Sequence, residues 1–135
     1  MSASEVISLD LNGGINFGNH TAKIKQKSND FEVNGDIYNV KTHSEITRVE
    51  KNGKLLFESV PGASVSGFVL TQKDCEFSIV GYASTQITME LEPGTEYDIY
   101  IDGANVGRSK SNLSSKLSFS AELNENYKKI CIKRI

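Results

Sequence analysis

Apolar and polar residues alternate in short runs along most of this chain. The clearest run is 116–123, in which Leu, Phe, Ala and Leu alternate with Lys, Ser, Ser and Glu. A period of two places one set of side chains on a buried face and the other in solvent, as in a half-buried β-strand. No window keeps a helical period for three turns, because glycine or β-branched residues interrupt each candidate. The pattern predicts a chain built from strands.

Turn signals separate these runs at short intervals. Asn-Gly, Asp-Gly or Pro-Gly pairs occur at 12–13, 34–35, 52–53, 61–62, 93–94 and 102–103. The strands predicted between them are 6–11, 22–27, 37–41, 46–50, 55–58, 65–71, 75–80, 86–91, 97–102, 116–123 and 128–134. Many short strands with regular turns are typical of all-β proteins, and we favour one antiparallel β-sandwich domain spanning residues 1–135.

Two segments carry weaker patterns. The stretch before Ile37 is poor in core residues, and we expect it to add an extra N-terminal hairpin to a sandwich formed by the remainder. Residues 107–115 are rich in Ser and Lys, which predicts a mobile loop between two strands.

The most distinctive run is Leu91-Glu92-Pro93-Gly94-Thr95-Glu96-Tyr97. Alternation stops at Leu91, a Pro-Gly turn follows, and alternation resumes at Tyr97, so two strands meet over a corner. The run resembles the Leu-x-Pro-Gly-Thr-x-Tyr corner of fibronectin type III and related immunoglobulin-like sandwiches. This resemblance covers roughly residues 87–109. It implies an immunoglobulin-like, fibronectin type III-like sandwich in which the Tyr97 hydroxyl bonds back to nearby backbone.

Charge and hydropathy exclude several classes of protein. The chain has 15 Lys and Arg against 17 Asp and Glu, whereas a nucleic-acid surface needs an excess of cations. Lys23, Lys25 and Lys27 are predicted to lie on one solvated strand face.

No apolar run approaches the roughly 18 residues of a membrane helix, so we expect no membrane insertion. Met1–Glu5 shows no signal-peptide pattern, which leaves a cytoplasmic protein or an exported module.

Catalytic chemistry is poorly supplied. His20 and His43 lie in no recognisable motif. Cys75 is in phase with inward-facing residues, and a buried thiol is a poor nucleophile. Cys131 has the opposite phase, so we expect two free thiols and no disulfide. We therefore predict no catalytic residues, no cofactor and no enzymatic activity. The least favoured alternative is a small enzyme that uses paired carboxylates, which residue spacing does not reveal.

Two acidic segments deserve comparison with calcium sites. Residues 10–14 place Asp and Asn before a tight turn, but the acid that closes an EF-hand loop is missing. Glu90, Glu92, Glu96, Asp98 and Asp102 cluster around the corner. We favour a plain turn and a solvated acidic face, and we predict no metal site.

Ligand binding is the chemistry that the sequence favours. Tyr100 alternates with Asp98 and Asp102, which places its ring outside the core. Exposed tyrosines beside Asp, Asn and Ser are typical of sugar- and protein-binding faces, because the ring stacks while its neighbours form hydrogen bonds. The candidate ligand-binding residues are Tyr38, Tyr82, Asp98, Tyr100, Asp102 and Tyr127.

These features predict a non-catalytic binding or accessory module. The tyrosine and aspartate residues favour a carbohydrate ligand, and the partner is a polysaccharide or a protein. Such a module belongs to a bacterial surface protein or a polysaccharide-processing enzyme. The alternative is a structural or assembly module of a filament, phage particle or surface array, which self-associates through exposed edge strands.

Overall fold

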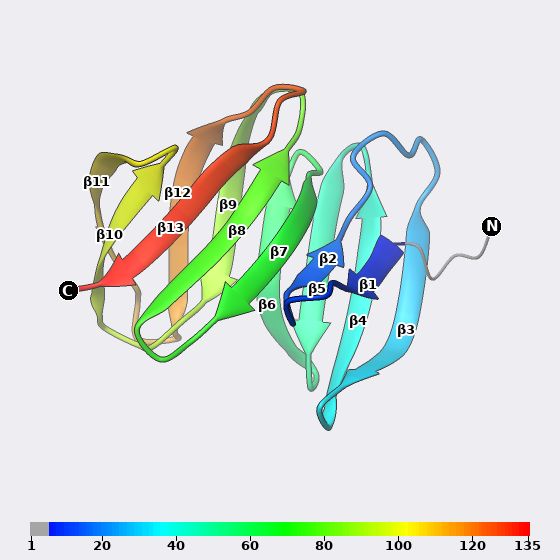
Figure 1. The fold of residues 1–135 in the computed structure, drawn as a ribbon, viewed down its shortest axis with the longest axis horizontal. Helices are drawn as coiled ribbons and strands as arrows, with labels where there is room; N and C mark the ends of the chain where they lie inside the picture. The colour runs from blue at the N-terminus through cyan, green and yellow to red at the C-terminus, as the bar shows by residue number, and fades with distance from the viewer. Residues whose placement is uncertain (1–5) are drawn as a thin grey trace.

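A computed structural model describes residues 6–135, which form two antiparallel β-sheets (Figure 1). Met1–Glu5, the segment without a signal-peptide pattern, lies outside the described residues. No helix in 6–135 is long and apolar enough to cross a bilayer. The strands are β1 (Ile7–Leu9), β2 (Ile15–Phe17), β3 (Gln26–Val33), β4 (Asp36–His43), β5 (Ile46–Lys51), β6 (Lys54–Val60), β7 (Ser64–Leu70), β8 (Asp74–Val80), β9 (Ser84–Glu90), β10 (Glu96–Ile101), β11 (Ala104–Lys110), β12 (Lys116–Glu122) and β13 (Lys128–Arg134).

The strands are divided between two sheets that lie face to face. Sheet A, in front in Figure 1, has the order β1-β2-β7-β8-β13-β10-β11. Sheet B, behind it, has the order β12-β9-β6-β5-β4-β3. The predicted all-β antiparallel sandwich is therefore confirmed.

A cluster of phenylalanine rings joins the two sheets. Phe57 of sheet B packs edge-on against Phe17 and Phe77 of sheet A, with ring centroids 5.1 and 5.8 Å apart. Phe68 of sheet A lies 5.5 Å from Phe77 and completes the cluster. Edge-to-face geometry adds to the apolar burial that these rings supply. The chain has no Trp, and all four of these phenylalanine rings lie buried in the hydrophobic core.

The N-terminal region extends both sheets. The predicted hairpin is present as β1 and β2, which join sheet A beside β7. The predicted strand 22–27 is wrong, because β3 begins at Gln26 and forms the edge of sheet B. A register shift near Asp30, which has a φ of 59°, breaks the alternation of β3. Lys23 and Lys25 precede the strand, so only Lys27 of the predicted lysine face lies on it.

The predicted mobile loop over residues 107–115 is also wrong in its first half. Residues Ala104–Lys110 form β11, which pairs with β10 at the edge of sheet A. Most of its side chains are exposed on both faces, so the sequence shows no apolar alternation there. Ser111, which follows the strand, is buried, and its hydroxyl accepts the Thr95 N–H at 2.9 Å. This segment is therefore fastened to the corner.

The corner itself crosses from one sheet to the other. β9 ends in sheet B, and β10 begins in sheet A with Tyr97 buried at 3% exposure. The Tyr97 hydroxyl accepts a hydrogen bond from the Glu92 N–H at 3.1 Å. The predicted bond from the tyrosine to upstream backbone is confirmed.

Both cysteines are free, as the strand phase predicts. Cys75 of β8 is fully buried, and this burial raises the pKa of its thiol. Cys131 of β13 is half-buried on the outer face of sheet A, where its thiol donates to Glu76 Oε1 at 3.3 Å. Burial and this hydrogen bond raise the Cys131 pKa.

Candidate functional site

The six predicted ligand-binding residues do not form one site, because they fall in three parts of the molecule: the core, the strand β10 with its turn, and one end of the sandwich. The expectation that Tyr38 is exposed is wrong, because its side chain points from β4 into the core and is 6% exposed. Val40 and Thr42 share this inward face. Tyr38 therefore contributes to packing and lies away from the exposed tyrosines.

Tyr100, Asp98 and Asp102 lie together on β10 and its turn, but they are engaged within the protein. The Lys133 ammonium lies 5.4 Å from the centre of the Tyr100 ring. Asp98 pairs with Arg108 Nε at 3.2 Å. Asp102 accepts the Lys129 N–H at 2.8 Å. These contacts leave the group less available to a ligand than its sequence pattern suggests.

The same outer face of sheet A carries charges of alternating sign. We call the following four residues, which are opposite one another across β8, β13, β10 and β11, the alternating row: Asp74, Lys133, Asp98 and Arg108. Opposite charges on neighbouring strands stabilise a sheet, whereas like charges destabilise it. The face is therefore electrostatically balanced by its own residues.

Tyr82 does not lie on a sheet face. It lies at one end of the sandwich, where the strands are joined by loops. The connections β2–β3, β4–β5, β6–β7, β8–β9 and β12–β13 meet there, at the top of Figure 1, and we call it the loop end. The Tyr82 side chain is 49% exposed. Its hydroxyl donates to the Ser44 carbonyl, and its ring lies 5.9 Å from the His20 ring. An exposed aromatic ring is thus held at both ends.

His20 is itself fixed by a serine from a distant part of the chain. Ser64 Oγ lies 2.7 Å from His20 Nδ1 and also accepts the His20 main-chain N–H at 3.1 Å. Burial lowers the pKa of His20, and Glu125 opposes this effect. No local sequence pattern indicates this contact, because 44 positions separate the two residues and only the strand pairing brings them together.

Buried threonines hold the two loops that carry this pair. The Thr42 and Thr47 hydroxyls lie 2.8 Å apart. Thr42 Oγ1 accepts the Asn19 N–H at 2.9 Å, next to His20 in sequence. Thr47 Oγ1 donates to the Ala63 carbonyl at 2.8 Å and accepts the Ala63 N–H at 3.1 Å, next to Ser64. Fully satisfied buried hydrogen bonds of this kind keep loops in one conformation.

A close backbone contact brings a further connection to the loop end. The Gly62 N–H donates to the Ser44 carbonyl at 3.0 Å, the same oxygen that receives the Tyr82 hydroxyl. A Cβ at position 62 would lie 2.0 Å from the His43 carbonyl oxygen, so only glycine fits. The Pro-Gly pair at 61–62, which the sequence predicts as a turn, therefore lies where two backbone segments approach closely.

Tyr127 belongs to the same end of the molecule. It lies in the β12–β13 connection and is 57% exposed. The Gly81 N–H donates to the Asn124 carbonyl at 3.2 Å, which joins this connection to the one that carries Tyr82. We call Tyr82, His20 and Tyr127 the loop-end platform.

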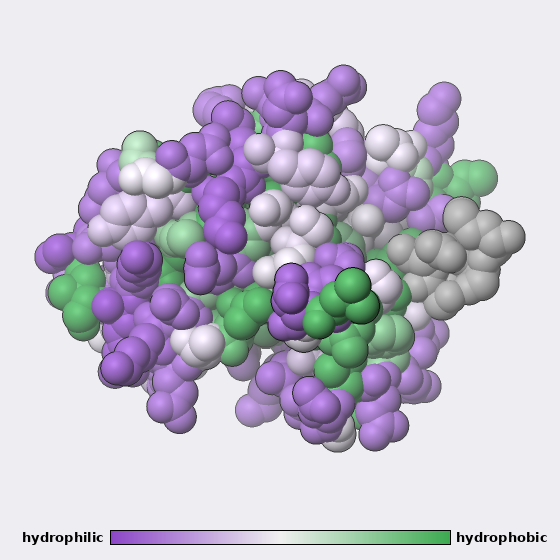
Figure 2. Space-filling view, viewed as in Figure 1, coloured by the Kyte–Doolittle hydropathy of each residue, from purple (hydrophilic) through white to green (hydrophobic). Residues whose placement is uncertain are grey.

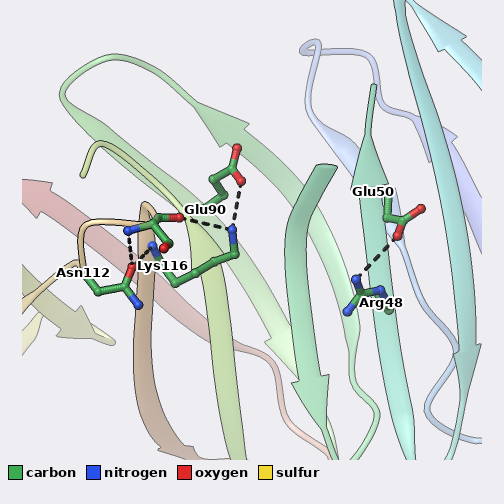
Figure 3. Close-up of polar contacts among 6 residues, drawn as sticks. Arg48, Glu50, Glu90, Asn112 and Lys116 are labelled. Carbon is green, nitrogen blue, oxygen red and sulfur yellow. Dashed lines mark hydrogen bonds and ion pairs between the residues drawn. The ribbon is translucent and has the colours of Figure 1, made fainter. Parts of the chain in front are cut away.

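The outer face of sheet B is strongly polar. Lys116 pairs with Glu90 at 3.0 Å between β12 and β9 (Figure 3). Arg48 of β5 pairs with Glu50 at 3.5 Å and with Glu58 of β6 at 2.6 Å (Figure 3 shows the first pair). This face presents charges and amides, whereas the loop-end platform presents rings.

Apolar side chains gather at the end opposite the loop end. Figure 2 shows them as a green patch near the β1–β2 turn and the end of β7, on a mostly hydrophilic face. The exposed apolar residues of these segments are Leu9, Leu11, Val69 and Leu70. Val69 and Leu70 also line a hollow of about 160 Å³ that opens between the sheets.

Metal ligands do not converge in the part of the chain that the structure describes. No three His, Cys, Asp or Glu side chains of residues 6–135 lie close enough together to hold an ion. Asp10 Oδ1 accepts the N–H groups of Asn12 and Gly14 at 2.9 and 2.8 Å, which is the geometry of a side-chain-capped turn.

Comparison of the chain with protein-family models, curated proteins and solved structures finds no match.

Proposed function

We propose that the protein is a non-catalytic binding module whose loop-end platform binds a carbohydrate. The observation that carries this proposal is the Tyr82 ring, which is half exposed and yet fixed by Ser44 and His20. Tyrosine offers a flat apolar face to the ring of a sugar and loses little conformational freedom when it is already held. Asn124, whose carbonyl accepts the N–H of neighbouring Gly81, and Glu125, whose charge acts on His20, supply polar groups at the same end of the molecule.

The fibronectin type III-like or immunoglobulin-like type of the sandwich is part of this proposal. It is supported by the corner between the two sheets and by the Tyr97–Glu92 hydrogen bond. The strand order adds a difference, since β13 lies between β8 and β10. In immunoglobulin sheets the strand after the corner is a direct neighbour of strand C. The proposed likeness therefore rests on the corner.

A module of this kind serves as an accessory domain. Its place is in a bacterial surface protein or a polysaccharide-processing enzyme, where it holds the protein on its glycan. Sandwich loops commonly carry binding residues because the sheets fix their positions.

The test is affinity electrophoresis of the protein and its variants against a panel of soluble neutral polysaccharides. We expect Tyr82→Ala to weaken binding to the retained glycan by about tenfold, because a stacked ring contributes on the order of 1.4 kcal/mol. The melting temperature should change little, since the side chain is half exposed.

Tyr100→Ala on sheet A is the matched control, and it should bind as the unaltered protein does. Loss of binding in Tyr100→Ala alone would move the site to sheet A. Absence of binding to every glycan of the panel would refute the carbohydrate proposal.

A second candidate function is assembly with other protein chains. The apolar patch around Leu11 and Leu70 favours it, because monomeric proteins seldom gather exposed apolar side chains without a role. In this case the patch would bury itself against a neighbouring subunit of a filament, phage particle or surface array.

A further inference from the structure

Three cations lie side by side on the outer face of sheet B. Lys27 of β3 is directly opposite Lys41 of β4, and Lys41 is directly opposite Arg48 of β5. We call these residues the cationic row. Directly opposite side chains on neighbouring antiparallel strands have Cβ atoms about 5 Å apart, so three positive charges share a short span.

This arrangement is the reverse of the one on sheet A. In the alternating row there, Lys133 lies between Asp74 and Asp98, and Arg108 on the edge strand is in contact with Asp98 at 3.2 Å. On sheet B, Arg48 has acidic partners, but neither Lys27 nor Lys41 forms an ion pair within residues 6–135. Like charges in register destabilise a sheet, so the fold gains nothing from this row. An anionic ligand would supply the missing partner.

The cationic row borders a hollow that fits small polar groups. The hollow has a volume of about 280 Å³, and its lining includes Lys27, Asn29, Asn39, Lys41, Arg48 and Glu50. Asn39 Oδ1 accepts the Asp30 N–H at 2.9 Å, which leaves the amide NH₂ as a donor. The register shift of β3 places Asn29 and Asp30 in this region, and bulges often redirect side chains beside binding sites.

We propose that this hollow binds the carboxylate or sulfate groups of an anionic polysaccharide. Lys27 and Lys41 provide the charge, and the Asn39 amide provides a neutral donor. Charge-assisted hydrogen bonds to such oxygens are about twice as strong as neutral ones. The site is separate from the loop-end platform, so the two can be tested independently.

The rest of the same cross-strand row favours a polysaccharide over a nucleic acid. Beyond Arg48 it continues through Glu58, Thr88 and Ser118 on β6, β9 and β12. A closely spaced phosphate backbone would meet the Glu58 carboxylate, and the chain as a whole has a net charge of -2. In a sugar chain the anionic groups are further apart, so its neutral hydroxyls can lie against Glu58, Thr88 and Ser118.

The experiment measures binding to polygalacturonate, dextran sulfate and uncharged dextran by titration calorimetry at low and raised salt. We expect one or both anionic polymers to bind, with weaker binding as salt rises. The double variant Lys27→Gln with Lys41→Gln should lose about tenfold or more in affinity, because two charge-assisted contacts disappear. Its melting temperature should equal or exceed that of the unaltered protein, since the repulsion is removed.

Lys110→Gln is the matched control, because it removes one exposed cation from the edge strand β11 of sheet A. It should bind as the unaltered protein does. Equal binding by the double variant, or no binding to either anionic polymer, would overturn the proposal. So would tighter binding to single-stranded DNA than to both anionic polymers.

Discussion

Two buried hydroxyls opposite one another on β5 and β6 have different energetic roles. Thr47 and Ser59 are register partners, and both are fully buried. Thr47 Oγ1 bonds to Thr42 and to both backbone groups of Ala63. Ser59 Oγ has no hydrogen-bond partner within residues 6–135. A buried hydroxyl without a partner keeps the cost of leaving water, whereas a satisfied one repays it.

Replacing each residue separates these roles. Ser59→Ala should raise the free energy of unfolding by about 1 kcal/mol, because it removes an unsatisfied group and leaves almost no cavity. Thr47→Val should lower it by about 2 kcal/mol or more, because it strips Ala63 and Thr42 of their partner. Equilibrium urea denaturation measures both values. A loss of stability in Ser59→Ala would contradict this account.

At the scale of elements, the sequence predicts strands that have one wet and one buried face. The predicted strand 128–134 has the same bounds as β13. The Asn52–Gly53 turn has the two positive φ angles of a type I′ hairpin. The predicted strand 22–27 differs from the edge strand β3, and part of the edge strand β11 falls in the predicted loop 107–115. A register shift within β3 and within β11 breaks the alternation there, whereas β12, also an edge strand, has a continuous register and a clear alternation.

The corner between β9 and β10 is the element most open to a direct test. Tyr97→Phe removes the acceptor of the Glu92 N–H and should lower the free energy of unfolding by about 1–3 kcal/mol. Chemical denaturation measures this loss. Tyr100→Phe, on the outer side of the same strand, makes the identical chemical change and should have a much smaller effect. Equal effects of the two substitutions would remove the structural role assigned to Tyr97.

At the scale of the whole molecule, sequence reasoning found single candidate residues but could not group them. The loop-end platform joins His20 to Ser64, and the cationic row joins Lys27 to Arg48 through Lys41. Both groupings depend on which strands are neighbours. That order follows from packing of the complete sandwich, and local periodicity does not encode it. Tyr38 differs from the expectation of an exposed ring because it shares the inward face of β4 with Val40 and Thr42.

The sheet edges bear on whether the molecule self-associates. β1 is only three residues long, and both β3 and β11 contain register shifts. Short, irregular edges discourage pairing with another chain. β12 is the edge with a continuous register over seven residues. Three of the four edges are therefore poor templates for assembly.

We accordingly expect a monomer in sedimentation velocity experiments over a wide range of concentration. A sedimentation coefficient that rises with concentration would favour the assembly module instead. Leu11→Ser would then show whether the apolar patch is responsible, and a proline at Ser118 would show whether the β12 edge is. The substitution that makes the sedimentation coefficient independent of concentration identifies the contact surface.

The two thiols differ in burial, so the rates at which a reagent labels them report how often the sandwich opens. A maleimide reaches Cys131 on the folded surface, slowly because the thiol is hydrogen-bonded to Glu76. It reaches Cys75 only when β8 separates from the layer behind it. The first mass increment therefore reports the native protein, and the second counts opening events. Slower appearance of the second increment with a polysaccharide present would measure how strongly that ligand stabilises the closed sandwich.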